Sequence, residues 1–321
     1  SYLGRVLEPE FRFSSGDVTS VTIYTLSFEE YLAAADIELF RMYLLIGNSV
    51  FEDKNYYEQL KQLYNIYCQI GGYRAVVEKY LSSGSLEIAT KELRRIIETF
   101  LNESMRYFTD ILDVSVFADI FLNICRILAR EKKGLEQDSI GEELQKLVVK
   151  DSTSNISKAT VVRAINWLYH SGIIGFCGKI VELDILDFKP GRRCYFMDLG
   201  IANFYMTQAG LDKASINGTL NENYVYINLV KRLDFPQQIA FETPAFATYK
   251  SGEIDFYVQS LKERTRYVIE VKSGKQTGNT AKKALFDGKA DYLLYLKGNT
   301  HGGVEGKIIT RPIYTLERFH F

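Results

Sequence analysis

The chain has 321 residues, of which 46% are hydrophobic and 25% are charged, so it can bury a sizeable core and form two or three domains. Its four cysteines lie far apart and form no CxxC pair, which argues against a disulfide framework or a zinc knuckle and favours a reducing compartment. No apolar run approaches the roughly 18 residues that span a bilayer, and no signal peptide opens the chain. We therefore expect a cytoplasmic protein without a membrane partner.

The charge is spread unevenly along the chain, although the formal net charge of −1 gives no overall attraction to nucleic acid. Residues 1–131 hold 13 basic and 19 acidic residues, a net charge of −6. Residues 222–321 hold 15 basic and 11 acidic residues, a net charge of +4. A polyanion would therefore meet the C-terminal third more readily.

The first 131 residues predict a short β-rich segment followed by helices. The stretch VTSVTIYTL, residues 18–26, is rich in β-branched residues and predicts a strand. Ser27 is then placed to cap a helix, and Glu30 completes a capping box. From there to about residue 131, apolar residues recur at helical spacing and predict a helical bundle, whose many tyrosines and phenylalanines we interpret as core packing.

Residues 132–205 follow the order of a winged helix-turn-helix. The stretches 140–149 and 157–171 predict two amphipathic helices, with Ser157 capping the second. Two β-rich stretches follow, and we expect them to be separated by a turn at Pro190-Gly191. Helix, turn, helix and a two-stranded ribbon is the order of a winged helix, which can bind DNA or dock a protein.

Residues 206–321 predict a small α/β sandwich. Helical and strand patterns alternate here: a helix at 221–233, strands at 238–249, 252–260 and 266–274, a helix at 280–288, and strands at 291–298 and 304–314. The chain as a whole therefore reads as a multidomain α and α/β protein divided at 1–25, 26–131, 132–205 and 206–321.

Two carboxylates and a lysine on neighbouring strands carry the clearest chemical signal. Asp255 lies near the end of one strand, and Glu270 and Lys272 lie on the next, two residues apart and so on one face. Two close carboxylates suit Mg²⁺ or Mn²⁺, and Glu222 on the preceding helix could reach the same ion. Such an ion would activate a phosphodiester, with Lys272 orienting or deprotonating the attacking water.

The same three residues also allow a plainer interpretation, a surface ion pair with a solvated lysine. The apolar neighbours Val268, Ile269 and Val271 argue against it, because charges in such a strand need a reason. Even a nuclease-like fold need not cut anything, since fold does not fix function.

Several basic residues are candidates for phosphate contacts. They are Lys158 and Arg163 on the second helix of the expected winged helix, Lys179, Arg192 and Arg193 near its wing, and Lys282 and Lys283 on the helix at 280–288. Residues 132–200 hold 10 basic and 9 acidic residues, which is a poor electrostatic footprint for DNA binding.

The order of elements and the residues Glu222, Asp255 and Glu270-Val271-Lys272 resemble the PD-(D/E)xK nuclease superfamily. That resemblance implies a core of helix, three strands, helix and strand, with catalytic Asp255, Glu270 and Lys272 and metal ligands Glu222, Asp255 and Glu270. Ile254 stands where the superfamily often has proline, and the helix that follows lacks a QxxxY motif.

Local signatures along most of the chain resemble a family of bacterial and archaeal AAA-type ATPases with a conserved C-terminal region of unknown function. They are SYLG at the start, YTLSFEEYL at 24–32, GGYRAVV at 71–77, and the series from YFMDLGIANF to YVIEVKSG. The resemblance implies that ATP binds to a domain preceding Ser1, and the chain itself contains no GxxxxGK[ST] loop. We therefore expect a fragment without ATPase activity.

Two functions remain open from the residues alone. One is a DNA- or RNA-directed module with a Mg²⁺-dependent nuclease site, coupled to an ATPase in the parent protein. The other is a regulatory module with a vestigial nuclease fold that binds a protein partner or another copy of itself.

Overall fold

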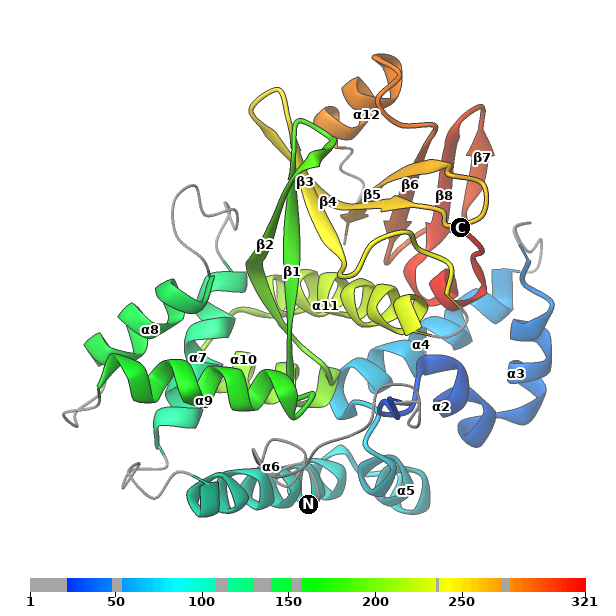
Figure 1. Ribbon diagram of the computed structural model, residues 1–321. Helices are drawn as coiled ribbons and strands as arrows, with labels where there is room; N and C mark the ends of the chain where they lie inside the picture. Colours follow the sequence, from blue (N-terminus) through cyan, green and yellow to red (C-terminus); the bar gives the residue numbers. More distant parts are fainter. Residues whose placement is uncertain are drawn as a thin grey trace, which may run out of the picture.

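Figure 1 shows the computed structural model of the chain. The structure describes residues 22–47, 54–107, 115–129, 140–151, 157–234, 237–272 and 278–321. Residues 18–21 of the strand expected at 18–26 lie outside these ranges, and the described part, 22–26, is irregular. The prediction fails there because the backbone bonds to α4 and to the connection that follows it: Leu26 N–H donates to the carbonyl of Gly72 (2.8 Å), and its carbonyl accepts from the Tyr67 hydroxyl (2.7 Å).

The helical region expected after residue 26 is present. Its helices are α2 (Phe28–Ala35), α3 (Ile37–Leu44), α4 (Lys54–Ile70), α5 (Arg74–Ser83), α6 (Leu86–Tyr107) and α7 (Ser115–Leu128). The capping box of α2 is confirmed, because the Ser27 hydroxyl accepts from Glu30 N–H (3.2 Å) and the Glu30 carboxylate accepts from Ser27 N–H (2.7 Å). Both bonds satisfy donors that a helix N-terminus leaves free.

Two helices and a β-hairpin follow, namely α8 (Ile140–Asp151), α9 (Lys158–His170), β1 (Ile174–Val181) and β2 (Asp184–Phe196). The prediction of a turn at Pro190-Gly191 is wrong. The hairpin turns at Glu182 and Leu183, which both have positive φ. Pro190-Gly191 instead forms an irregularity inside β2, opposite the register shift between Cys177 and Lys179. Proline cannot donate to a ladder, so it is tolerated at a bulge on an edge strand.

The remaining elements are α10 (Leu199–Gln208), α11 (Lys213–Asp234), β3 (Ala245–Tyr249), β4 (Gly252–Gln259), β5 (Arg266–Lys272), α12 (Asn279–Phe286), β6 (Tyr292–Lys297), β7 (Gly303–Glu305), β8 (Ile308–Pro312) and the 3₁₀ helix η1 (Ile313–Arg318). From α11 onward the order is helix, three strands, helix and strand, as the sequence pattern predicts.

One mixed sheet of eight strands joins the hairpin to these later strands, in the order β2-β1-β3-β4-β5-β6-β8-β7. The β1 strand pairs in parallel with β3, with Gly178 opposite Ala245. Strand β4 is antiparallel to both β3 and β5, and β5, β6 and β8 run parallel. The expected wing is therefore the extension of the sheet that carries Asp255 and Glu270.

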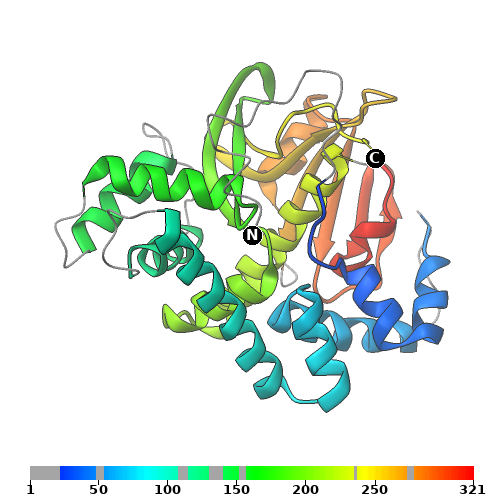
Figure 2. The same cartoon turned by 60° about the horizontal axis from the view of Figure 1, so that its bottom comes forward.

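Both faces of the sheet are covered. The larger core packs α11 and the preceding helices against residues such as Phe256 and Ile269, while the smaller core packs α12 against Tyr257 and Val268. Neighbouring residues of a strand point to opposite faces, which is why Val268 and Ile269 belong to different cores. Figures 1 and 2 show α11 between the sheet and the other helices, with α12 on the far side.

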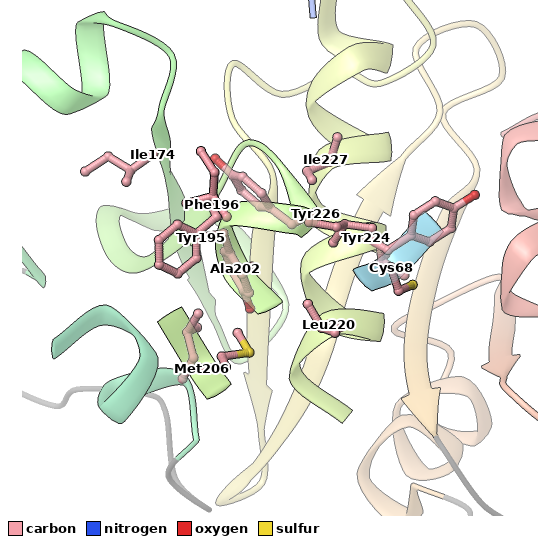
Figure 3. Close-up of a cluster of buried hydrophobic side chains, with 14 of the residues drawn as sticks. Cys68, Ile174, Tyr195, Phe196, Ala202, Met206, Leu220, Tyr224, Tyr226 and Ile227 are labelled. Atoms are coloured by element: carbon pink, nitrogen blue, oxygen red, sulfur yellow. The ribbon is translucent and has the colours of Figure 1, made fainter. Parts of the chain in front are cut away.

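The larger core is rich in aromatic side chains that join the helical region to the sheet. Figure 3 shows Tyr224 and Tyr226 of α11 among apolar residues from several elements. Tyr226 stacks on Tyr195 of β2 with ring centroids 4.6 Å apart, and Tyr224 meets Tyr64 of α4 edge-on at 5.0 Å. Such pairs stabilise beyond the area they bury, so α11 helps to fix the helical region against the sheet.

Candidate functional site

The candidate site lies where strands β4 and β5 separate. Their ladder ends at the pair Phe256 and Ile269, one residue before Asp255 on β4 and Glu270 on β5. Asp255 therefore sits inside β4 rather than near its end, at the point where pairing with β5 stops. Because Ile269 faces α11, strand alternation turns Glu270 and Lys272 toward the α12 face.

The structure brings Asp255, Glu270 and Lys272 together. The Lys272 ammonium lies 2.6 Å from Glu270 Oε2 and 3.2 Å from Asp255 Oδ2. The same Asp255 oxygen accepts a hydrogen bond from Val271 N–H at 2.7 Å. Glu270 is buried, and the side chains of Asp255 and Lys272 are 19% and 24% exposed. The two carboxylates thus share one cation at the edge of the core.

Glu222 supplies a third carboxylate, from α11. It is buried, and its charge raises the pKa of both Asp255 and Glu270. A helix residue thus acts electrostatically on the strand residues, while the expectation that Glu222 reaches the same ion stays a prediction. Asn223 beside it is wholly buried and bonds both backbone groups of Phe196, which anchors this part of α11 on β2.

The buried carboxylates are costly to ionise. Burial is the largest cause that raises the pKa of Asp255, followed by Glu222, while Lys272 and the Val271 N–H oppose the rise. Burial and the Asp255 charge raise the pKa of Glu270 to about 7, again against Lys272. Burial alone would lower the pKa of Lys272, but the two carboxylates hold it above its ordinary value. Lys272 therefore keeps its proton at neutral pH.

Gly278 closes the site beside Glu270, and the sequence pattern did not single it out. A Cβ atom added to this glycine would lie 2.3 Å from Glu270 Cδ and within 2.6 Å of both carboxylate oxygens. Its φ of −71° suits any residue, so the glycine is needed for space and not for backbone conformation. The one signal in the sequence was its place two residues before the helix expected at 280–288.

Arg193 is placed differently from a surface phosphate ligand. Its side chain is 2% exposed and donates to Glu253 Oε2 at 2.8 Å. Its guanidinium carbon also lies 3.7 Å from the centre of the Phe246 ring, and its charge lowers the pKa of Asp255. The expected contact between Arg193 and a nucleic-acid phosphate is therefore corrected, because burial removes this side chain from the surface.

The other basic candidates do not form one surface. Lys158 and Arg163 are exposed on α9, and Lys282 and Lys283 are exposed on α12. Figure 1 places α9 and α12 at opposite sides of the molecule. Lys179 and Arg192 are half-buried on the hairpin between them.

Two of the three expected metal ligands, Asp255 and Glu270, are placed so that they could hold a divalent ion. Within the described ranges no group of three or more His, Cys, Asp or Glu side chains is arranged to hold an ion. Mg²⁺, however, commonly takes one or two protein carboxylates and completes its shell with water and substrate phosphates. Asp255 and Glu270 fit that mode, because both already hold a cationic group, Lys272, within 3.2 Å.

Comparison with known proteins identifies one segment of the chain. Residues 61–214 match a domain of unknown function, DUF8612. The DUF8612 segment runs from α4 to the start of α11 and so includes the hairpin but none of Glu222, Asp255, Glu270 and Lys272. No curated protein and no solved structure matches the chain. Among the described helices, none has the length and apolar composition of a bilayer-spanning segment.

Proposed function

We propose that this chain carries a Mg²⁺- or Mn²⁺-dependent phosphodiesterase site for nucleic acid, built on Asp255, Glu270 and Lys272. The observation that carries the proposal is the convergence of one buried and one partly buried carboxylate on one lysine at the point where two strands part. Burying a charge is costly unless it is paired and hydrogen-bonded, and this arrangement keeps three charged groups together where the ladder between β4 and β5 ends.

The order of elements supports the same proposal. Helix α11, strands β3 to β5, helix α12 and strand β6 follow the succession of the PD-(D/E)xK core, with Glu222, Asp255 and Glu270-Val271-Lys272 at the corresponding places. A bound ion would act as a Lewis acid on the phosphodiester and lower the pKa of its water.

The chain's own residues suggest a division of roles at this site. Lys272 keeps its proton, so it offsets phosphate charge and orients the water, and we no longer assign it the role of base. Glu270, whose pKa is about 7, can hold or release a proton near neutral pH. Asp255 is fixed by the Val271 N–H and holds its carboxylate toward the same point.

In the parent protein we place this site downstream of an AAA-type ATPase domain, which would bind ATP outside the present chain. The support is the resemblance of the signatures at 24–32, 71–77 and 195–274 to that family. The DUF8612 segment contains the second of these signatures and the start of the third.

The test is metal-dependent cleavage of single- and double-stranded DNA and of RNA. Asp255→Ala and Lys272→Ala should lower cleavage at least about a hundredfold while circular dichroism shows an intact fold. Lys79→Ala, at an exposed position of α5 outside the proposed site, is the matched control for the loss of a lysine. Unreduced cleavage by both site variants would remove the assignment.

A second candidate function is favoured by one feature of the site. Lys272 already bridges Asp255 and Glu270, so the three groups compensate one another in part without an ion. In a non-catalytic module that binds a protein partner or a second copy of the chain, this cluster would serve only the fold. The absence of metal-dependent cleavage together with an absence of metal binding would favour this alternative.

A further inference from the structure

A cavity of about 690 Å³ lies between helices α4, α10 and α11, next to the turn that follows β6. Its volume is within the range of about 300–1,000 Å³ that is typical of small-molecule sites. Cys68 of α4 and Leu220 of α11, which both line the cavity, are labelled in Figure 3. Neither the carboxylate site nor the DUF8612 match assigns a role to this cavity.

Two matching rows of polar side chains line it. Each row begins with a lysine and continues with two amides at intervals of four residues, a spacing that places all three on one face of a helix. The rows are Lys61, Asn65 and Gln69 on α4 and Lys213, Asn217 and Asn221 on α11. The two helices thus present the same sequence of chemical groups to one space.

Contacts between elements hold the cavity walls in place. The Tyr64 hydroxyl of α4 donates to Asn221 Oδ1 of α11 at 3.1 Å, and Tyr64 is itself buried. Lys61 Nζ donates to Asn299 Oδ1 at 3.2 Å, and Asn203 Nδ2 of α10 donates to the Gln69 carbonyl at 3.3 Å. A site formed before its ligand arrives loses less entropy on binding.

The charge of the lining favours an anion. Among the residues that the structure describes, the lining contains two lysines and no aspartate or glutamate, although acidic residues make up 40 of the 321 positions in the chain. Glu58 lies 3.8 Å from Lys61, but both side chains are partly exposed, so this pair offsets the positive charge only weakly.

The remaining lining is apolar on the α11 side. Ile216 and Leu220 lie between the polar residues of that helix, and Leu211 precedes it. A ligand that suits all these groups has a flat apolar body, hydrogen-bonding edges and a negative charge. Amide side chains pair with the edges of nucleobases, and lysines bind phosphate. We propose that this cavity binds a nucleotide.

The cavity borders the carboxylate site through two elements. Asn221, which lines it, directly precedes Glu222, and Gly298, which also lines it, donates its N–H to the Lys272 carbonyl at 3.2 Å. A nucleotide held here would therefore lie beside the elements that carry Glu222 and Lys272, which links the cavity to the proposed nuclease site. This part of the inference rests on the proposed function; nucleotide binding by itself does not.

Binding is measured in the presence of EDTA, so that cleavage plays no part, with two probes: adenosine 5′-monophosphate and a fluorescent single-stranded oligodeoxynucleotide. The variants are Lys61→Gln/Lys213→Gln, which removes both charges, and Asn65→Leu/Asn217→Leu, which removes two exposed amides. Lys79→Gln/Lys262→Gln removes two exposed lysines outside the cavity and is the matched control.

We expect both cavity variants to weaken binding about tenfold or more, and the control to bind like the wild type. Weakened binding of the mononucleotide identifies a free nucleotide as the ligand, and weakened binding of the oligonucleotide alone identifies a nucleotide within a strand. The proposal is overturned when the wild type binds neither probe, when the cavity variants bind like the wild type, or when the control loses as much binding as the cavity variants. Cleavage is assayed separately, so loss of the proposed nuclease function leaves these outcomes readable.

Discussion

The carboxylate of Asp255 accepts a hydrogen bond from the backbone N–H of Val271 at 2.7 Å. A side chain of β4 thereby binds a backbone group of β5 at the place where the regular ladder between these strands has ended. This contact satisfies a donor that would otherwise lose its partner and holds Asp255 beside Lys272. The Asp255 carboxylate therefore takes the place of the ladder bond that is missing where the two strands separate.

The ionisation of Glu270 should make the protein less stable as the pH rises. Its pKa is about 7 in the fold, against an ordinary value of 4.5, so the folded state binds the proton more tightly than the unfolded state. Stability therefore falls as the pH rises from about 4.5 to about 7 and stays low above that. Glu270→Gln should remove this dependence. Relative to the wild type, the free energy of unfolding of the variant should be on the order of 2 kcal/mol higher at pH 8 than at pH 5.

Urea unfolding at pH 5 and pH 8 measures the effect. Glu305→Gln, at an exposed carboxylate on β7, is the control and should leave the pH dependence of the wild type in place. Equal pH dependence in the wild type and Glu270→Gln would show that Glu270 is not held in a costly ionised state.

Gly278→Ala should damage the site through space alone. The added methyl group would overlap the Glu270 carboxylate, which is tightly enclosed, and overpacking of this kind costs about 1–3 kcal/mol. Gly218→Ala is the control, because a Cβ at Gly218 meets no atom within 4 Å and the residue lies inside helix α11. That change should stabilise the protein by about 0.5–1 kcal/mol. Thermal unfolding of both variants tests the pair, and a neutral Gly278→Ala would contradict the packing described around Glu270.

Replacing Arg193 should lower the stability of the fold, because this charged side chain is buried. Its guanidinium pairs with Glu253 and stacks on Phe246, so Arg193→Met leaves acidic groups without their cation and should cost about 3 kcal/mol. Lys189→Met, at an exposed position of the same strand, should change stability by less than about 0.5 kcal/mol. Chemical denaturation of the two variants gives the comparison; similar values would mean that the buried charge contributes nothing specific.

Asp198 should be sensitive to substitution, because it joins two elements of the DUF8612 segment. Its buried carboxylate accepts from Gly72 N–H (2.8 Å), Gly200 N–H (2.8 Å) and Ile201 N–H (3.2 Å), which ties the end of α4 to the start of α10. Asp198→Ala leaves these donors unsatisfied and should cost about 3 kcal/mol or more.

Asp212→Ala is the matched control for Asp198→Ala. Asp212 accepts similar bonds from Ala214 and Ser215 at the start of α11, but it is exposed, so water can replace its bonds and the cost should be about 1 kcal/mol. Equal losses for the two variants, measured by thermal unfolding, would show that burial does not set the value of this contact.

Much of the fold followed from periodicity. The capping box at Ser27 and the succession of elements after α11 could be predicted, because caps and apolar spacing are local features. The turn of the hairpin could not, since Pro190-Gly191 is the stronger local signal, whereas the chain turns at Glu182 and Leu183. Their positive φ is imposed by strand pairing, which sequence spacing does not reveal.

The site was predictable only in part, for the same reason. Asp255, Glu270 and Lys272 converge because two strands pair in register, which the spacing suggested. Gly278 and Arg193 act through distant contacts, with Glu270 and with Glu253. The pairing of β1 with β3 places Arg193 in the core, so an arginine expected near the wing became a buried ion.

Titration of Mn²⁺ by calorimetry at pH 8 tests the central claim most directly, with the wild type and Asp255→Asn compared. We expect the wild type to bind one ion and the variant to bind it at least about tenfold more weakly. Binding should also weaken at pH 6, where Glu270 must first release its proton. No binding to the wild type at millimolar Mn²⁺, or equal binding by Asp255→Asn, would contradict a divalent-ion site at these carboxylates.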